Sequence, residues 1–203
     1  MWTFVSQQEQ LKQAVVILHE IYGLNDFIEE LCISYQQKGY AVFAPNLLKR
    51  EITFAYEQET EAYTYFNQQV GFKIVKQVER LINDLKEEYE QVIVIGFSVG
   101  ATLAWLCCEN SNCAAVVCFY GSRIRDYLHL QPVCPALVLF ASEDLFEVDK
   151  VIELLSGKAN LESKKITGRH GFMDSYGKKF SFTSNLEAQK SVELFLAELE
   201  TMI

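Results

Sequence analysis

Basic residues are scarce in this sequence, and long apolar runs are missing from it. The 203 residues include 18 Lys and Arg against 27 Asp and Glu, which gives a formal net charge of −9. Because no dense basic cluster is present, we do not expect the chain to bind nucleic acid or an anionic membrane. No apolar run approaches the roughly 18 residues that span a bilayer, and the first residues do not resemble a secretion signal. We therefore expect a cytoplasmic protein.

Motifs for metal, cofactor and disulfide chemistry are also missing. The six cysteines form no Cys-x-x-Cys pair and no Cys/His spacing typical of a metal site. We expect free thiols in a reducing compartment, with no metal and no cofactor. Neither repeats nor a linker divide the chain, so we expect a single domain over residues 1–203, as a monomer or a small homo-oligomer. Four of the cysteines lie in apolar sequence: Cys107, Cys108, Cys113 and Cys118.

Short apolar runs alternate with helical patterns along the chain. The runs are apolar on both faces, which is typical of strands covered on both sides in a parallel sheet. Between them, apolar residues spaced three and four apart indicate helices, and residues 99–108 are apolar nearly all round. The alternation predicts an α/β fold with a mostly parallel central sheet flanked by helices on both faces. The runs lie at Ala14–Leu18, Tyr40–Ala44, Val92–Ile95, Ala114–Phe119 and Ala136–Phe140.

Residues 46–69 are the least regular part of the sequence. They are rich in aromatic and acidic residues and show no clean period. Two interpretations stay open for them. They form a helix pair with a weak pattern, or part of them caps an active site.

Ser98 stands in a Gly-x-Ser-x-Gly motif, "GFSVG", between an expected strand and an expected helix. A serine on such a sharp turn needs small residues two positions away on each side. The turn exposes the hydroxyl at the N-terminus of a helix, where a developing oxyanion is favoured. We therefore expect Ser98 to be a nucleophile. The alternative is a glycine-rich turn in which Ser98 only caps the helix.

A serine nucleophile needs a base, and the sequence has only three histidines. In α/β-hydrolases the order along the chain is Ser, then acid, then His. His19 precedes the serine, and His129 leaves little room for an acid. His170, in a glycine-flanked loop after an expected strand at Leu161–Ile166, satisfies the order and is our candidate base.

The acid is expected where a strand reaches the same edge of the sheet. Asp144 follows the apolar run at Ala136–Phe140 and precedes His170, so we expect it to orient the imidazole and stabilise the imidazolium. The alternative for Asp144 and for the neighbouring Glu143, Glu147 and Asp149 is that they are charges at a helix start.

With these residues placed, the chain resembles the dienelactone hydrolase family over nearly its whole length, least between about residues 46 and 70. The segment "VILHEIYGLNDFIEEL" resembles the family's strand that ends in Glu-Ile-Phe/Tyr-Gly before a helix. "GFSVG", "CFYG", "VCPALVLFASEDLF" and "RHGF" follow in the family's order and approximate spacing. The resemblance implies the α/β-hydrolase fold.

The resemblance also implies roles for individual residues. Ser98, Asp144 and His170 would form the catalytic triad, and the backbone N–H groups of Ile21 and Val99 would form the oxyanion hole. Substrate-binding positions would be Glu20, Tyr120 and Arg123. For Glu20 the alternative is a charge at the start of a helix, and for Arg123, as for Arg125 and Arg169, it is an ordinary solvated surface residue.

The sequence departs from the family at two functional positions. The best-known members have cysteine at the position of Ser98, so the reaction here would be of the serine type. Members that act on dienelactone hold its carboxylate with arginines, one of them four residues after the histidine, where this chain has Asp174. An acid there repels a carboxylate, which argues against dienelactone as the substrate.

We therefore predict a hydrolase that cleaves a small ester, lactone or thioester through an acyl-enzyme. A binding protein that retains the fold without turnover is the alternative, although it would have no need of the full triad and its glycines. A nucleotide-binding domain is a third hypothesis, but neither Gly-x-Gly-x-x-Gly nor a P-loop motif is present.

Overall fold

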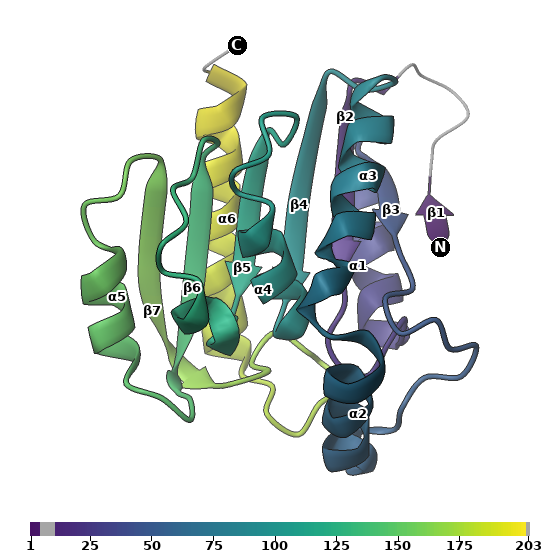
Figure 1. Cartoon of the computed structure of the whole chain (residues 1–203), viewed down its shortest axis with the longest axis vertical. Helices are drawn as coiled ribbons and strands as arrows, with labels where there is room; N and C mark the ends of the chain where they lie inside the picture. The colour runs from purple at the N-terminus through teal and green to yellow at the C-terminus, as the bar shows by residue number, and fades with distance from the viewer. Residues whose placement is uncertain (5–10, 202–203) are drawn as a thin grey trace.

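The computed structural model describes residues 1–4 and 11–201 and is built around a seven-stranded sheet (Figure 1). The strand order is β1-β3-β2-β4-β5-β6-β7. Neighbours from β3 to β7 are parallel, and only the edge strand β1 pairs in the antiparallel sense, with β3. The strands are β1 (Trp2–Phe4), β2 (Gln13–Leu18), β3 (Ala41–Ala44), β4 (Gln91–Phe97), β5 (Ala115–Phe119), β6 (Ala136–Glu143) and β7 (Leu161–Arg169).

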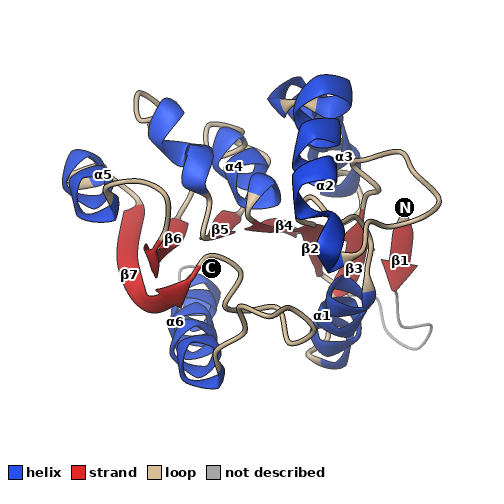
Figure 2. Ribbon diagram, turned by 90° about the horizontal axis from the view of Figure 1, so that it is seen from below, coloured by secondary structure: helices blue, strands red, loops and turns tan. Residues whose placement is uncertain are grey.

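Helices cover both faces of the sheet, as the sequence predicts. Figure 2 shows α1 and α6 on one face and α3, α4 and α5 on the other. Within the described ranges, no helix is both long enough and apolar enough to cross a membrane. The helices are α1 (Asp26–Gln37), α2 (Glu59–Tyr65), α3 (Val75–Lys86), α4 (Val99–Leu106), α5 (Val148–Leu155) and α6 (Phe182–Thr201).

The apolar strands separate two hydrophobic layers. Successive side chains of a strand point to opposite faces, so a strand buried on both sides contributes to both layers. In β2, Val16 and Leu18 pack in the layer under α3, α4 and α5, while Val15 and Ile17 pack in the layer under α1 and α6. This explains why the strands are continuous apolar runs rather than alternating ones.

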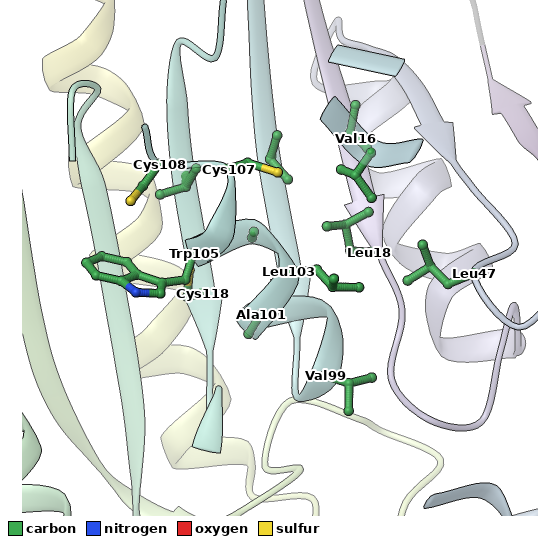
Figure 3. Close-up of a cluster of buried hydrophobic side chains, with 14 of the residues drawn as sticks. Val16, Leu18, Leu47, Val99, Ala101, Leu103, Trp105, Cys107, Cys108 and Cys118 are labelled. Carbon is green, nitrogen blue, oxygen red and sulfur yellow. The ribbon is translucent and has the colours of Figure 1, made fainter. Parts of the chain in front are cut away.

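Helix α4 lies at the centre of one layer, which accounts for its apolar composition on all sides. Figure 3 shows Leu103 directed toward Val16 and Leu18 of β2, and Trp105 on the side of Cys118. Trp105 is completely buried, and its indole N–H donates a hydrogen bond of 3.0 Å to the Tyr127 carbonyl. Truncation of a core tryptophan to alanine costs about 3–5 kcal/mol, so Trp105 firmly anchors the last turn of α4.

The ends of two strands differ from the prediction in a way that matters for the site. Strand β6 continues to Glu143 rather than ending at Phe140, so Asp144 is the first residue after it. Strand β7 likewise continues to Arg169 and ends directly before His170. The two strands pair with each other as far as Glu143 and Arg169. Their last residues are polar, so a search for apolar runs places the strand ends too early.

Residues 46–70 form a cap segment beyond the carboxyl ends of the strands, where Figure 1 shows α2. The segment contains a short 3-10 helix at Tyr56–Gln58, then α2, and then a turn of π-helix at Phe66–Val70. Its base is tied to the fold by a hydrogen bond of 2.9 Å from the Phe54 amide to the Tyr22 carbonyl. Both interpretations of this stretch are therefore partly right, because it is helical and it also lines the pocket described below.

Candidate active site

Ser98 occupies the sharp turn between β4 and α4. Its backbone has φ 54° and ψ −112°, a conformation that is strained for a residue with a side chain. A Cβ on Gly96 would overlap the Gly100 carbonyl, and a Cβ on Gly100 would overlap the Leu18 carbonyl. The two glycines are thus needed because backbone segments pass one another at this point. The turn brings the Ser98 side chain into the wall of a pocket.

The structure brings Ser98, His170 and Asp144 together from the ends of three strands. Ser98 Oγ lies 2.8 Å from His170 Nε2, and His170 Nδ1 lies 2.8 Å from Asp144 Oδ2. The Asp144 side chain is 4% exposed, whereas that of His170 is 27% exposed and faces the pocket. Asp144 Oδ1 also accepts a hydrogen bond from the Leu145 amide, which fixes the carboxylate. With Nδ1 donating to this carboxylate, Nε2 is left to accept the serine proton.

Ile21 and Val99 both line the pocket beside Ser98. Val99 is the first residue of α4, and the first N–H groups of a helix have no acceptor within it and carry partial positive charge. Ile21 lies in the turn between β2 and α1. A two-amide oxyanion hole takes one donor directly after the nucleophile and one from an early strand-to-helix turn, and these two residues occupy those positions in the chain.

His19 supports the turn that carries Ile21, a role that the sequence does not reveal. It is completely buried; Nε2 accepts a hydrogen bond of 3.0 Å from the Leu47 amide, and Nδ1 donates to the Glu20 carbonyl at 2.6 Å. Burial lowers the pKa of His19 to about 4, so the ring is neutral near pH 7 and both nitrogens are engaged. In the sequence, only the position of His19 directly after an apolar run hinted that it lies close to the site.

Glu20 lies in the pocket wall and is only 7% exposed. Burial, and after it the negative charge of Asp174, raises the pKa of Glu20 to about 7. Nearby His170, Tyr120 and Lys179 act against the rise. The Tyr120 hydroxyl acts as a donor toward the Glu20 carboxylate, but within residues 1–4 and 11–201 neither this hydroxyl nor Glu20 Oε1 makes a hydrogen bond of good geometry.

Tyr120 differs from the expectation that it lines the pocket. It is fully buried, and its ring lies behind the histidine, with centroids 5.1 Å from His170 and 5.1 Å from Phe172. Its φ of 42° turns the chain at the end of β5 and places the side chain under the His170 loop. Tyr120 therefore packs against His170 instead of forming a wall of the cavity.

Arg123, Arg125 and Arg169 all lie at the pocket and are also accessible to solvent, so their positions agree with both interpretations, a substrate contact and an ordinary solvated surface. Arg123 is 42% exposed and forms an ion pair of 2.8 Å with Asp126. Arg125 donates to the Ser122 carbonyl and lies over the Phe146 ring at 5.0 Å. Arg169 donates to the Lys178 carbonyl at 3.1 Å.

Asp174 links the histidine loop to the cap segment. It is 2% exposed, accepts a hydrogen bond of 2.7 Å from the Tyr56 hydroxyl, and accepts another from the Tyr176 amide. Burial raises the pKa of Asp174, and these hydrogen bonds oppose the rise. Two ion pairs join the same two segments, Lys178 with Glu57 at 3.2 Å and Lys179 with Glu59 at 2.9 Å. The opposite charges of "YEQE" and "GKK" were the only sequence signal for this contact.

The pocket has a volume of about 810 Å³, which suits a small organic molecule. It lies between the Ser98 turn, the His170 loop, the 3-10 helix at Ser122–Asp126 and the cap segment. All six cysteines are free and buried, as expected from their apolar context. In the part of the chain that the structure describes, no cluster of three His, Cys, Asp or Glu residues could hold a metal.

Comparisons with known proteins agree with this architecture. A family model described as "Dienelactone hydrolase family" matches residues 1–193. The protein YczH of Bacillus subtilis (strain 168) is 37% identical over 168 residues, which cover 79% of this chain and 81% of that protein. The carboxymethylenebutenolidase of Pseudomonas putida is 24% identical over 143 residues, which cover 65% of this chain and 61% of that protein.

A solved structure shows the same fold. The dienelactone hydrolase from Anabaena variabilis superposes with a TM-score of 0.68 and 18% sequence identity, covering 96% of this chain and 89% of that chain. At this identity the likeness concerns the fold alone. The α/β-hydrolase fold expected from the sequence is thereby confirmed.

Proposed function

The chain belongs to the dienelactone hydrolase family and is a hydrolase of ester bonds, and from this premise we propose that it is a serine hydrolase that cleaves a small ester, lactone or thioester through an acyl-enzyme. The observation that carries the proposal is the continuous relay from Ser98 Oγ through His170 to Asp144, with 2.8 Å at each step. A serine hydroxyl is a weak nucleophile near neutral pH, and this relay supplies the base that activates it.

The reaction would proceed in two halves. His170 Nε2 takes the Ser98 proton as Oγ attacks the substrate carbonyl, and the amides of Ile21 and Val99 hold the oxyanion. His170 then gives the proton to the leaving oxygen or sulfur, which departs and leaves an ester on Ser98. Water, deprotonated by His170, then attacks that ester; the bond to Ser98 Oγ breaks as His170 returns the proton to Oγ, which releases the acid and restores the enzyme. Throughout, Asp144 holds the imidazole in the tautomer that accepts at Nε2.

We also propose that residues 1–203 form one catalytic domain that works in the cytoplasm as a monomer or a small homo-oligomer. Two observations support the single domain and the reducing compartment. The seven strands belong to one sheet, and all six thiols are free and buried, as is usual for proteins of reducing compartments.

The nucleophile is tested with a fluorophosphonate probe and with hydrolysis of p-nitrophenyl acetate. We expect the wild type and the surface control Ser156→Ala to be labelled and to turn over the ester, because Ser156 is exposed and lies at the end of α5. Ser98→Ala should lose the label and nearly all turnover. Equal labelling and equal rates in Ser98→Ala and wild type would reject the serine mechanism. Absence of turnover in every protein would favour the non-catalytic binding protein.

A further inference from the structure

The cations of the pocket already have partners inside the protein. Ion pairs hold Arg123, Lys178 and Lys179, and carbonyl oxygens accept from Arg125 and Arg169. A substrate carboxylate would therefore have to compete with an existing contact at each of them. None of these cations is both buried and without a contact inside the protein, unlike an arginine held ready for a substrate carboxylate.

The acids of the pocket are not equally engaged. Asp144 is bonded to His170, and Asp174 accepts from Tyr56 and the Tyr176 amide. Glu20 is different, because its buried Oε1 makes no hydrogen bond of good geometry among the described residues, and only the Tyr120 hydroxyl acts as a donor toward its carboxylate. A buried carboxylate with so few donors recovers only part of the interaction with water that it loses on burial. A positively charged group on a bound molecule would give the Glu20 carboxylate an additional partner.

The surroundings of Glu20 also suit an organic cation. Tyr22 and Tyr56 line the same pocket, with ring centroids 4.8 Å apart. Aromatic faces attract ammonium groups, and a neighbouring carboxylate adds to that attraction. Asp174 lies near enough to Glu20 to disfavour its ionised form, whereas His170 and Lys179 favour it. A cation bound beside Glu20 would therefore be attracted by two carboxylates.

We propose that Glu20 is a specificity-determining residue that makes the pocket select esters with a positively charged group, such as an ammonium, close to the scissile bond. The inference rests on the proposed serine-hydrolase function and concerns the substrate class of that site. A positive charge on the substrate is attracted by the neighbouring carboxylates of Glu20 and Asp174, whereas a substrate carboxylate is repelled by them.

Matched esters test the proposal on both sides of the scissile bond. For the acyl side, p-nitrophenyl 4-(trimethylammonio)butyrate is compared with its neutral carbon isostere, p-nitrophenyl 5,5-dimethylhexanoate, and with anionic p-nitrophenyl hemiglutarate. For the alcohol side, the ester acetylcholine is compared with its neutral isostere, 3,3-dimethylbutyl acetate. In at least one of the two series we expect kcat/KM at pH 8 to favour the cationic ester over the neutral one by about tenfold or more, and hemiglutarate to be the poorest acyl substrate. The series with the preference identifies the side that faces Glu20.

The wild-type pH dependence tests the proposal without any variant. The ratio of kcat/KM for the cationic ester to that for its neutral isostere removes the contribution of His170, because both substrates use the same base. The charged and titratable groups that face Glu20 and influence its ionisation are Asp174, His170, Tyr120 and Lys179. Since Glu20 loses its proton as the pH rises through about 7, the ratio should increase between pH 6 and pH 8.

Glu20→Gln should bring the ratio close to one in the series that shows the preference. The matched control Glu61→Gln removes the same charge from an exposed position of α2 outside the pocket and should keep the wild-type ratio. A wild-type ratio near one in both series, or a ratio that does not change with pH or with Glu20→Gln, would overturn the inference. Neutral esters that are hydrolysed through Ser98 in that case would leave the proposed function standing, whereas hydrolysis that persists in Ser98→Ala would reject the proposed function itself.

Discussion

Glu20→Gln should stabilise the folded protein more and more as the pH rises. The folded-state pKa of Glu20 is about 7, compared with an ordinary value of 4.5, because the carboxyl group is buried and lies near Asp174. A group whose pKa is raised by folding favours the folded state most at low pH and loses that contribution as the pH rises through its folded pKa. Glutamine has nearly the same shape and no proton to lose, so the variant escapes this loss.

The pKa shift of Glu20 sets the size of this change in the free energy of unfolding. A rise from 4.5 to about 7 corresponds to roughly 3 kcal/mol at about 1.4 kcal/mol for each pKa unit. Because only 7% of Glu20 is exposed, little of this is screened by solvent. The free energy of unfolding of Glu20→Gln, minus that of the wild type, should therefore increase by about 3 kcal/mol between pH 4.5 and pH 8.

Urea unfolding at several pH values between 4.5 and 8 measures this difference. His19 titrates in the opposite sense: its pKa is lowered to about 4, so its contribution is present above pH 6.5 and is lost as the pH falls toward 4. That contribution is common to both proteins and disappears in the subtraction. Glu61→Gln is the matched control and should show no trend. A difference that stays constant within about 0.5 kcal/mol across the range would refute the raised pKa of Glu20.

Three other predictions concern the relay, the turn and the thiols. Asp144→Asn should fold normally but lose about 10⁴-fold in kcat, because the amide favours the wrong tautomer of His170; a loss of less than tenfold in ester turnover would contradict the relay. Gly100→Ala should unfold at much lower urea concentration than wild type or fail to fold, since the added methyl group would overlap the Leu18 carbonyl; an unchanged midpoint would show that the backbones are farther apart. The six thiols should react with dithionitrobenzoate within minutes in denaturant but far more slowly in native protein, because all are buried; rapid native reaction of several thiols would contradict that burial.

The sequence is most informative where chemistry and backbone geometry coincide. "GFSVG" predicts the turn at Ser98 because only glycine tolerates the close passage of backbone at Gly96 and Gly100. The order of Ser98, Asp144 and His170 is sufficient to choose one histidine out of three, and the structure brings those three side chains together. Apolar runs likewise locate the central strands, since burial on both faces leaves no polar position in them.

Other features depend on contacts between distant parts of the chain and cannot be read from local patterns. The edge strand β1 has three residues and one partner, β3, so it leaves no period to detect. Tyr120 was expected in the pocket wall, but its positive φ directs the ring beneath His170. Asp174 was interpreted only as a charge facing the substrate, whereas its carboxylate accepts a hydrogen bond from Tyr56, 118 residues earlier.

The cap segment supplies part of the pocket roof and none of the three residues of the relay. Its links to the His170 loop are one hydrogen bond and two ion pairs, all made by side chains of residues 56–59. The cap segment can therefore contribute to substrate choice without contributing a group to bond cleavage. A roof fastened in this way can be lengthened, shortened or recharged through mutation while the reactive machinery below keeps its geometry, which gives this scaffold an easy route to new substrates.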